Sequence, residues 1–414
     1  MAEAIRVLHF ADLHIGMENY GQIDPKTGVN ERVLDFIRRL KEIVDYALEN
    51  DADLVIFAGD AFKTRDPNPT YLREFGRQIM RLSRANLPMV ALVGNHDMPL
   101  MDKRANSLDV FRTLDVPNVI VGSREHLHRI QTKRGVVQVA TVPWPLRSRL
   151  IQLDADGNYR RMNVEQLDRE LEKLVEEEIQ QLAKEADPTL PLILTGHFTV
   201  SGATFGSERG VMVGRDAVIS IAALSHPNID YVALGHIHKH QSLNAEQKPP
   251  IVYAGSLERI DFGEEREHKG FCWINLQRGN TIWQFIPIKV RRFLTIDVDA
   301  TKDSESPTEA VLRAIERHDV ADAVVRVRVK LNGPQEIHFK PKEVENALSA
   351  AKFVAGIARE VQRDNRTRIG IANPEAKSPI ELLDAYFISK NIAQDRANEL
   401  LQLAKEMLGE DVTR

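Results

Sequence analysis

Short apolar, β-branched runs alternate with longer amphipathic segments over the first 285 residues of the chain. This alternation of strands and helices is typical of a layered α/β domain. Turn-favouring residues open or flank the polar segment that follows each of the clearest apolar runs, which predicts buried strands that end in loops. These predicted strands are Ile5–Phe10, Leu54–Ala58, Met89–Val93, Leu192–Thr195 and Tyr231–Leu234.

Segments between these strands carry apolar residues at intervals of three and four positions, the spacing of an amphipathic helix. The longest has a charged outer face, which we interpret as a solvated surface without further function. The helices predicted in this part of the chain are Asn30–Ala47, Pro69–Ala85, Arg104–Leu114 and Asn163–Ala186.

The pattern changes near Lys289, where a second set of elements begins. Strands around 292–298, 325–331 and 353–361, with helices at 308–318 and 342–351, predict a small α+β domain. A stretch containing Gly, Pro and Asn then predicts a linker. The expected parts are an α/β domain at 1–285, the α+β domain at 286–364, the linker at 365–377 and a helical tail at 378–414.

The tail begins with a capping box, Ser378-Pro379-Ile380-Glu381, and has proline at the first helical position. Two short helices after a linker have little core of their own to bury, so we expect their apolar residues to bind a partner. Packing of the pair back onto the main body is the alternative. The residues predicted to bind the partner are Ile380, Leu383, Tyr386, Phe387, Leu400, Leu401 and Leu408.

Composition is ordinary for a soluble globular protein, with 43% apolar and 28% charged residues. The single cysteine, Cys272, excludes an intrachain disulfide and fits a reducing compartment. A formal charge of −5 argues against a uniformly basic DNA-coating protein but leaves room for a local basic stripe. No segment has the roughly 20 apolar residues of a membrane span, and a strand begins almost at once, without room for a signal peptide. We expect a cytoplasmic protein with no membrane contact.

Polar segments rich in metal-binding side chains follow the five clearest strands. Because ligand sites collect at strand ends in α/β sheets, we expect these segments to converge on one rim. Their oxygen and nitrogen donors, without thiolate, suit manganese, iron or zinc, and a pair of such ions can clamp and hydrolyse a phosphate ester. The segments are Asp12-Leu13-His14, Gly59-Asp60, Gly94-Asn95-His96-Asp97, Gly196-His197 and Gly235-His236-Ile237-His238.

Any one of these residues alone would be weak support, because a lone histidine is more often structural and Asp or Asn often caps a turn. Their ordered recurrence after five strands is what predicts a di-metal centre. Asp12 and His14 point to the same side if the backbone stays extended, and His236 and His238 repeat that spacing. Asp60 stands alone in its loop and is the natural bridge between two ions.

Together the five segments resemble the signature of the calcineurin-like metallophosphoesterases, which include phosphatases, nucleotidases and nucleases. Residues 254–264 (AGSLERIDFGE) and 269–271 (KGF) further resemble the SbcD-type nucleases of DNA double-strand-break repair. The resemblance implies a two-sheet αββα sandwich for the nuclease domain at 1–285 and a smaller α+β DNA-capping domain at 286–364. It also implies a C-terminal helical pair that binds the coiled coil of an ATPase.

The same resemblance implies roles for individual residues. One ion, most often manganese, would be held by Asp12, His14, Asp60 and His238, and a second by Asp60, Asn95, His197 and His236. His96 would contact the scissile phosphate, and Asp97 would orient His96 by accepting its hydrogen bond. His240 would either contact the substrate or have only a surface role.

DNA contacts are expected from basic residues in two places. Lys63, where some family members have histidine, and Arg65 would lie near the DNA entrance. A rigid surface turn is the other interpretation of that loop. Cations alternate with valines in the predicted strand at 325–331, so they would face outward, either toward phosphates or simply toward solvent. The predicted DNA contacts here are Arg291, Arg292, Arg326, Arg328 and Lys330.

The resemblance also implies the biological setting. Family members act on DNA ends and hairpins as manganese-dependent exonucleases and structure-selective endonucleases, as homodimers bound to an SbcC-type ABC ATPase. The dimer contact would lie within residues 69–114, and the protein would be associated with the nucleoid. The chain has no Gly-x-x-x-x-Gly-Lys loop, so we expect ATP to be bound by the partner.

Two other functions compete with the nuclease. A phosphatase or small-molecule phosphodiesterase could use the same fold, but protein phosphatases of this type continue Gly-Asp into Asp-Arg-Gly, whereas this chain continues Ala61-Phe62-Lys63. A DNA-end tether with vestigial hydrolysis is the third interpretation. The complete set of candidate ligands and His96 argues against that loss of chemistry.

Overall fold

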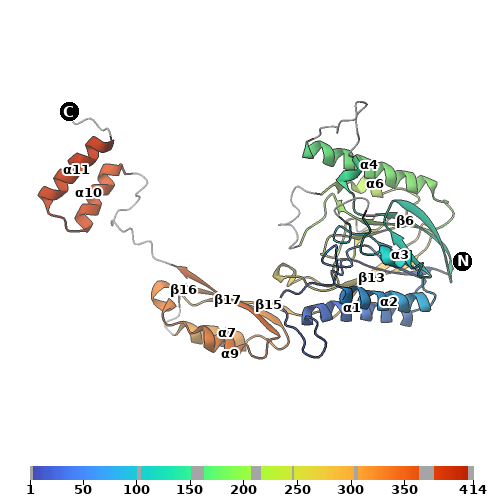
Figure 1. Cartoon of the computed structure of the whole chain (residues 1–414), viewed down its shortest axis with the longest axis horizontal. Helices are drawn as coiled ribbons and strands as arrows, with labels where there is room; N and C mark the ends of the chain where they lie inside the picture. The colour runs from blue at the N-terminus through green and yellow to red at the C-terminus, as the bar shows by residue number, and fades with distance from the viewer. Residues whose placement is uncertain are drawn as a thin grey trace. The chain divides into compact units, whose positions relative to one another are not determined.

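The computed structural model describes residues 3–99, 104–150, 163–206, 216–244, 247–302, 306–362 and 377–408. The chain forms two compact units (Figure 1). The larger comprises residues 1–295, 319–326 and 348–356, and the smaller comprises 296–318, 327–347 and 357–414. Of the predicted linker at 365–377, only Lys377 lies within the described residues, and the predicted domain boundaries stay predictions.

The first sheet of the larger unit has six strands in the order β14-β13-β1-β2-β3-β4. Strands β1 to β4 are parallel, and β13 pairs with β1 in the antiparallel direction. The strands are β1 Ile5–Phe10, β2 Leu54–Phe57, β3 Met89–Leu92, β4 Val119–Gly122, β13 Gly270–Leu276 and β14 Ile282–Pro287.

The second sheet also has six strands, in the order β11-β12-β10-β7-β6-β5. Its central strands β6, β7, β10 and β12 run parallel, so their carboxyl ends share one edge. The strands are β5 His126–Thr132, β6 Gly135–Val142, β7 Leu192–His197, β10 Tyr231–Gly235, β11 Gln241–Ser242 and β12 Ile251–Tyr253. A separate two-stranded ladder joins β8 Thr199–Val200 to β9 Val218–Ile219.

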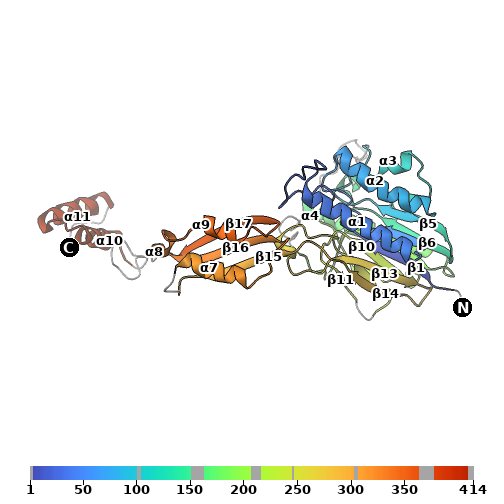
Figure 2. The ribbon, with the colours of Figure 1, turned by 90° about the horizontal axis from the view of Figure 1, so that it is seen from below.

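The two sheets pack face to face with helices on both outer sides (Figures 1 and 2). One apolar cluster lies between the sheets and includes Val7, Ile56, Val139 and Ile193. A second cluster packs the first sheet against its helices, and a third packs the second sheet against its helices. These helices are α1 Glu31–Glu49, α2 Pro69–Arg84 and α3 Asp109–Thr113 on the first sheet, and α4 Val164–Glu185 and α6 Ile221–Leu224 on the second.

The structure confirms the predicted two-sheet αββα sandwich, and all five strands expected to carry polar loops are present. One helix is shorter than predicted, because α3 begins only at Asp109. Asn106 and Asp109 explain this start. The Asn106 side chain accepts a hydrogen bond from the Leu108 N–H, and the Asp109 carboxylate accepts one from the Asn106 N–H, which holds a turn in place of a helix.

A third sheet has the order β15-β16-β17 and carries the predicted alternation. Val325, Val327 and Val329 are fully buried, whereas Arg328 and Lys330 are exposed. The elements of this region are β15 Phe293–Asp299, α7 Pro307–Glu316, β16 Val324–Asn332, α8 Gly333–Glu336, α9 Pro341–Ala347 and β17 Phe353–Gln362.

The tail forms the two predicted helices, α10 Pro379–Ser389 and α11 Gln394–Leu408, and the capping box at Ser378 is present. Phe387 is buried, so its side chain belongs to the core of the pair, which corrects the expectation that it binds a partner. Tyr386 and Leu408 are exposed, and three apolar side chains that were not predicted are exposed with them: Ile388, Leu403 and Met407. No helix within the described residues combines the length and apolar character needed to cross a membrane.

Candidate metal centre

Five loops meet at the carboxyl ends of β1, β2, β3, β7 and β10. The loop after β1 continues to pair with the loop after β2, since the Asp12 N–H donates to the Gly59 carbonyl (3.0 Å) and the His14 N–H to the Asp60 carbonyl (3.0 Å). Across the sandwich, the His236 N–H donates to the Asp12 carboxylate at 2.9 Å. These hydrogen bonds, two between backbone groups and one from a backbone N–H to a carboxylate, therefore position the polar segments of both sheets against one another.

The backbone at several predicted ligands is left-handed. Positive φ angles occur at Asp12 (51°), His14 (45°), Asp60 (62°) and His236 (95°). The segment after β1 is therefore not extended, and the alternation argument for Asp12 and His14 was wrong, although both side chains still reach one cluster. Non-glycine residues with positive φ are uncommon and concentrate at functional sites, where the surrounding structure holds them in place.

Glycines before the ligands allow the loops to approach closely. A Cβ atom at Gly59 would lie 2.4 Å from the His197 Nδ1, and one at Gly94 would lie 2.1 Å from the Asp60 Oδ1. Both distances are far below van der Waals contact, so a larger residue would displace a candidate ligand. The Gly-Asp and Gly-Asn-His motifs thus have a steric cause.

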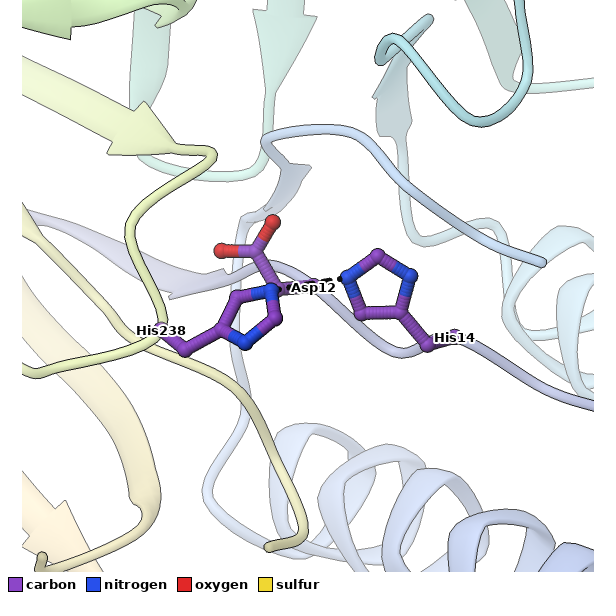
Figure 3. Close-up of side chains that lie close together, drawn as sticks. All are labelled: Asp12, His14 and His238. Carbon is purple, nitrogen blue, oxygen red and sulfur yellow. Dashed lines mark hydrogen bonds between the residues drawn. The ribbon is translucent and has the colours of Figure 1, made fainter. Parts of the chain in front are cut away.

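One group of side chains joins Asp12, His14 and His238, all of them buried (Figure 3). The Nε2 atoms of His14 and His238 face each other at 3.0 Å. The Nδ1 of His238 lies 2.9 Å from the Glu264 carboxylate, so this nitrogen carries the proton and the Nε2 presents a lone pair. Burial holds the pKa of His14 well below its usual value, which keeps that ring neutral as metal ligation requires.

Asp60 lies at the centre of the cluster. Its Oδ2 is 3.7 Å from the His14 Nε2 and 3.3 Å from the His197 Nε2. Burial alone would raise its pKa, but His197 and the other rings around it lower the pKa below its usual range. Burial alone would likewise lower the pKa of His197, yet the Asp60 carboxylate raises it to about 9. A cation bound between the two would displace the proton on His197.

Asn95, His197 and His236 form the adjoining group. The Asn95 Oδ1 lies 3.1 Å from the His197 Nε2 and 3.2 Å from the His236 Nδ1. The other nitrogen of His236 lies 3.1 Å from the Oδ2 of Asp216, a residue that sequence reasoning missed. His197 is tied through its Nδ1 to the Ala58 carbonyl at 2.6 Å.

The donor set fits two divalent cations. Buried imidazoles lie beside buried carboxylates, and Asp60 belongs both to a group with His14 and to a group with Asp12 and His197. Carboxylate, amide and imidazole donors without thiolate suit first-row divalent ions. The structure brings the seven predicted ligands into one continuous cluster, while their division between two ions stays a prediction.

His96 and Asp97 lie beside the cluster in a different relation from the expected one. The His96 Nδ1 lies 2.7 Å from the Lys63 carbonyl, which can only accept, so the Nδ1 carries a proton. The Asp97 carboxylate instead accepts from the N–H groups of Asp60, Ala61 and Gly94 and from the Ser107 hydroxyl. This corrects the expectation that Asp97 orients His96, since the Lys63 backbone does so and Asp97 joins the loops after β2 and β3. Burial and the charge of Asp60 raise the pKa of Asp97 to about 6.

A fully buried ion pair, formed by Glu264 and Lys269, contacts His238 on the side away from His14. Glu264 lies 2.9 Å from the Lys269 Nζ, and both side chains are 0% exposed. Lys269 also donates to the Ser256 hydroxyl (2.8 Å), the Glu267 carboxylate (2.8 Å) and the His238 carbonyl (3.1 Å). Despite burial, Lys269 and His238 lower the pKa of Glu264 to about 2. Both residues lie in the SbcD-like stretch of the sequence, but nothing in that stretch shows that they face His238.

Glu264→Gln is expected to weaken binding of the ion beside His238 by about 10- to 100-fold, because metal affinity depends on the partner of a ligating imidazole. Titration calorimetry of the metal-free protein with Mn²⁺ measures the change. Glu267→Gln is the matched control, since Glu267 shares Lys269 but makes no hydrogen bond to His238 within the described part of the chain. Equal affinities in the two variants would contradict the role given to Glu264.

The residues predicted to contact DNA differ in exposure. Lys63 is half-buried and Arg65 is exposed, with its Nε donating to the Met98 carbonyl at 2.7 Å. Arg291 is only 8% exposed and its guanidinium pairs with Asp35 at 2.8 Å, which corrects the expectation of a DNA contact there. Arg326 is half-buried over the Phe262 ring, and Arg292 and Arg328 pair with Asp319 and Asp297 at 2.9 and 2.6 Å.

Residues 5–240 match the family model of the calcineurin-like phosphoesterases. The chain is 28% identical over 269 residues to the D component of nuclease SbcCD from Escherichia coli K12, covering 63% of this chain and 62% of that protein. It is 26% identical over 318 residues to the DNA double-strand break repair protein Mre11 of Archaeoglobus fulgidus (71% and 62%). The protein of the same name from Methanosarcina acetivorans is 23% identical over 384 residues (91% and 54%). The chain thus spans less than two thirds of the length of each of these relatives.

Proposed function

Because this chain belongs to the calcineurin-like phosphoesterase family, we propose that it is a manganese-dependent DNA nuclease, with exonuclease and structure-selective endonuclease activity on DNA ends and hairpins. The observation that carries the proposal is the buried cluster around Asp60, in a chain whose relatives are named as a nuclease component and as break-repair proteins. Two divalent ions held by Asp12, His14, Asp60, Asn95, His197, His236 and His238 would polarise a phosphodiester and activate water.

His96 is the group proposed to act on the substrate itself. Its Nδ1 is bound to the Lys63 carbonyl, so the Nε2 is the nitrogen left to face a bound phosphodiester. From there it would stabilise charge on the phosphate or donate a proton to the departing oxygen. Lys63 and Arg65, on the same loop, would hold the neighbouring phosphates. In the smaller unit, the exposed Lys330 would make a DNA contact of its own.

We also propose a partner and an assembly. An SbcC-type ABC ATPase would bind the helix pair α10–α11, whose exposed Tyr386, Ile388 and Met407 offer an apolar surface to a coiled coil. A homodimer would form through residues 69–114, where Val110 and Leu114 are exposed. These interactions would place the protein in the cytoplasm, at the nucleoid.

The direct test compares linear duplex DNA, hairpin DNA and bis(p-nitrophenyl) phosphate, each with Mn²⁺, with Mg²⁺ and with chelator. We expect Mn²⁺-dependent DNA cleavage that exceeds turnover of the small ester and is lost with chelator. Efficient ester hydrolysis with intact DNA would instead assign the site to a small-molecule phosphoesterase. DNA binding without any hydrolysis would assign it to an end tether.

His96→Ala is expected to lower the rate of DNA cleavage by about 10²- to 10⁴-fold, the usual contribution of a positioned proton donor. Its bound-metal content, measured by elemental analysis, should equal that of the unchanged protein. His126→Ala, an exposed histidine on β5, is the control. Loss of metal from His96→Ala would show that His96 is a ligand, since His14 and Asp60 lie close enough to share an ion with it.

A further inference from the structure

A pocket of about 570 Å³ opens beside the candidate metal centre. Its lining comes from Met98 and Pro99, from described residues at and just before α3, from the residues after β4 and from those after β6. Trp144 joins it to the metal centre, because the Trp144 ring lies 4.8 Å from the His236 ring and 6.3 Å from the His197 ring, centroid to centroid. The pocket therefore adjoins the cluster on the side of Asn95, His197 and His236. Its volume falls within the range of small-ligand sites.

Trp144 is held in place but not covered. Its backbone N–H donates to the Val93 carbonyl at 3.2 Å, which fixes the residue at the end of β3. The side chain is half-buried, and its indole N–H has no hydrogen-bond partner among the residues that the structure describes. A rigid aromatic ring that lines an open polar pocket is a stacking surface for a nucleobase, whatever the identity of the base.

Cations line the same pocket as this ring. Arg104, Arg112 and Arg124 line the pocket with two acidic residues, Asp109 and Glu125. Asp109 is already neutralised by Arg112 at 2.8 Å. Arg124 is exposed and forms no ion pair within the described residues, so its guanidinium remains available to a phosphate.

We propose that this pocket binds the nucleotide that flanks the cleaved linkage, with its base stacked on Trp144 and its further phosphate held by Arg124. The inference rests on the proposed nuclease function and deepens it. A substrate with a base beside the phosphodiester would fill this pocket and bind more tightly than one without a base. Such a preference would distinguish a nuclease from a small-molecule phosphoesterase with the same metal ligands. Trp144 is thus a substrate-binding residue as well as a neighbour of His236.

Cleavage of matched oligonucleotides tests this subsite. One substrate is intact, and two others lack the base on one or the other side of the cleaved linkage. Trp144→Ala should raise the KM for the intact strand by roughly 5- to 150-fold, the range for loss of one stacked base. The penalty should disappear on one of the abasic strands, and Trp144→Phe should restore most of the affinity. Arg129→Ala, an exposed arginine on β5, should change nothing.

Two outcomes would overturn the inference. If Trp144→Ala slows intact and abasic strands by the same factor, Trp144 only supports His236. If both variants of Trp144 leave the KM unchanged, no base stacks there.

A second measurement separates this inference from the nuclease proposal. In chelator, binding of a short oligonucleotide should quench tryptophan fluorescence of the unchanged protein and not of Trp144→Ala. If Trp144-dependent quenching occurs but Mn²⁺ supports no cleavage, the nucleotide subsite stands and the nuclease proposal fails. If Mn²⁺ supports cleavage but the quenching does not depend on Trp144, the nuclease proposal stands and the subsite fails.

Discussion

Asp60→Asn is expected to lower DNA cleavage by about a thousandfold, because the carboxylate that two ions would share supplies several kcal/mol of charge stabilisation in the transition state. Asparagine tolerates the left-handed backbone at this position (φ 62°) and can still accept the hydrogen bond from the His96 N–H (2.8 Å). The fold should therefore survive. Kinetics on linear duplex DNA and elemental analysis of bound metal measure the two consequences, and we expect the metal content to fall below two ions per chain.

Removing the Asp60 carboxylate should destabilise the metal-free protein, because this carboxylate lies 3.3 Å from the His197 Nε2 and raises the pKa of His197 to about 9, so the change breaks a buried charge pair. The melting temperature in chelator should thus be lower in Asp60→Asn than in the unchanged protein. Asp53→Asn provides the control, because Asp53 is also buried but pairs with Arg134 away from the cluster. Full metal content with near-normal cleavage in Asp60→Asn would show that Asp60 does not bridge two ions.

Lys269→Met is expected to cost about 3–5 kcal/mol of the free energy of unfolding, the usual loss when one partner of a buried ion pair is removed. Methionine fills most of the volume of the lysine stem but leaves Glu264 charged, and the partners that remain for its carboxylate among the described residues are His238 and the Ile260 N–H. The same change should weaken metal binding at His238, because Lys269 also holds the His238 carbonyl. Urea denaturation of the metal-free protein measures the first effect.

The double variant Glu264→Gln/Lys269→Met separates the ion pair from simple packing. It no longer contains an unpaired buried charge, so it should regain part of the stability lost in Lys269→Met. If the double variant is as unstable as the sum of its single changes, the two residues do not act as a pair, and the support proposed for His238 fails.

The parallel strands of the metal centre could be predicted because each is a short apolar run followed by a polar loop, as in Leu54–Phe57 and Asp60. The edge strand β5 gave no such pattern, since it mixes charged and apolar residues and several of its side chains are solvent-exposed. The pattern of apolar and polar residues also did not predict the backbone conformation of the loops. Spacing alone indicated an extended Asp12–His14, whereas pairing with the loop after β2 requires left-handed residues there.

The residues that gather in the cluster could be predicted from the sequence, whereas the residues that support them could not. Asp12, Asp60 and the histidines belong to short motifs, so a local pattern identifies them. Asp216, Glu264 and Trp144 contact the ligands through long-range packing, which one sequence does not reveal. Asp97 shows the same limit, because its neighbour in sequence is His96 but its hydrogen bonds go to the backbone around Asp60.

Anomalous X-ray diffraction at the manganese edge, from crystals grown with Mn²⁺, shows directly whether the five loops hold two ions that share Asp60. We expect two anomalous peaks, one among Asp12, His14, Asp60 and His238 and the other among Asp60, Asn95, His197 and His236. A single peak, or two peaks without Asp60 between them, would contradict this arrangement.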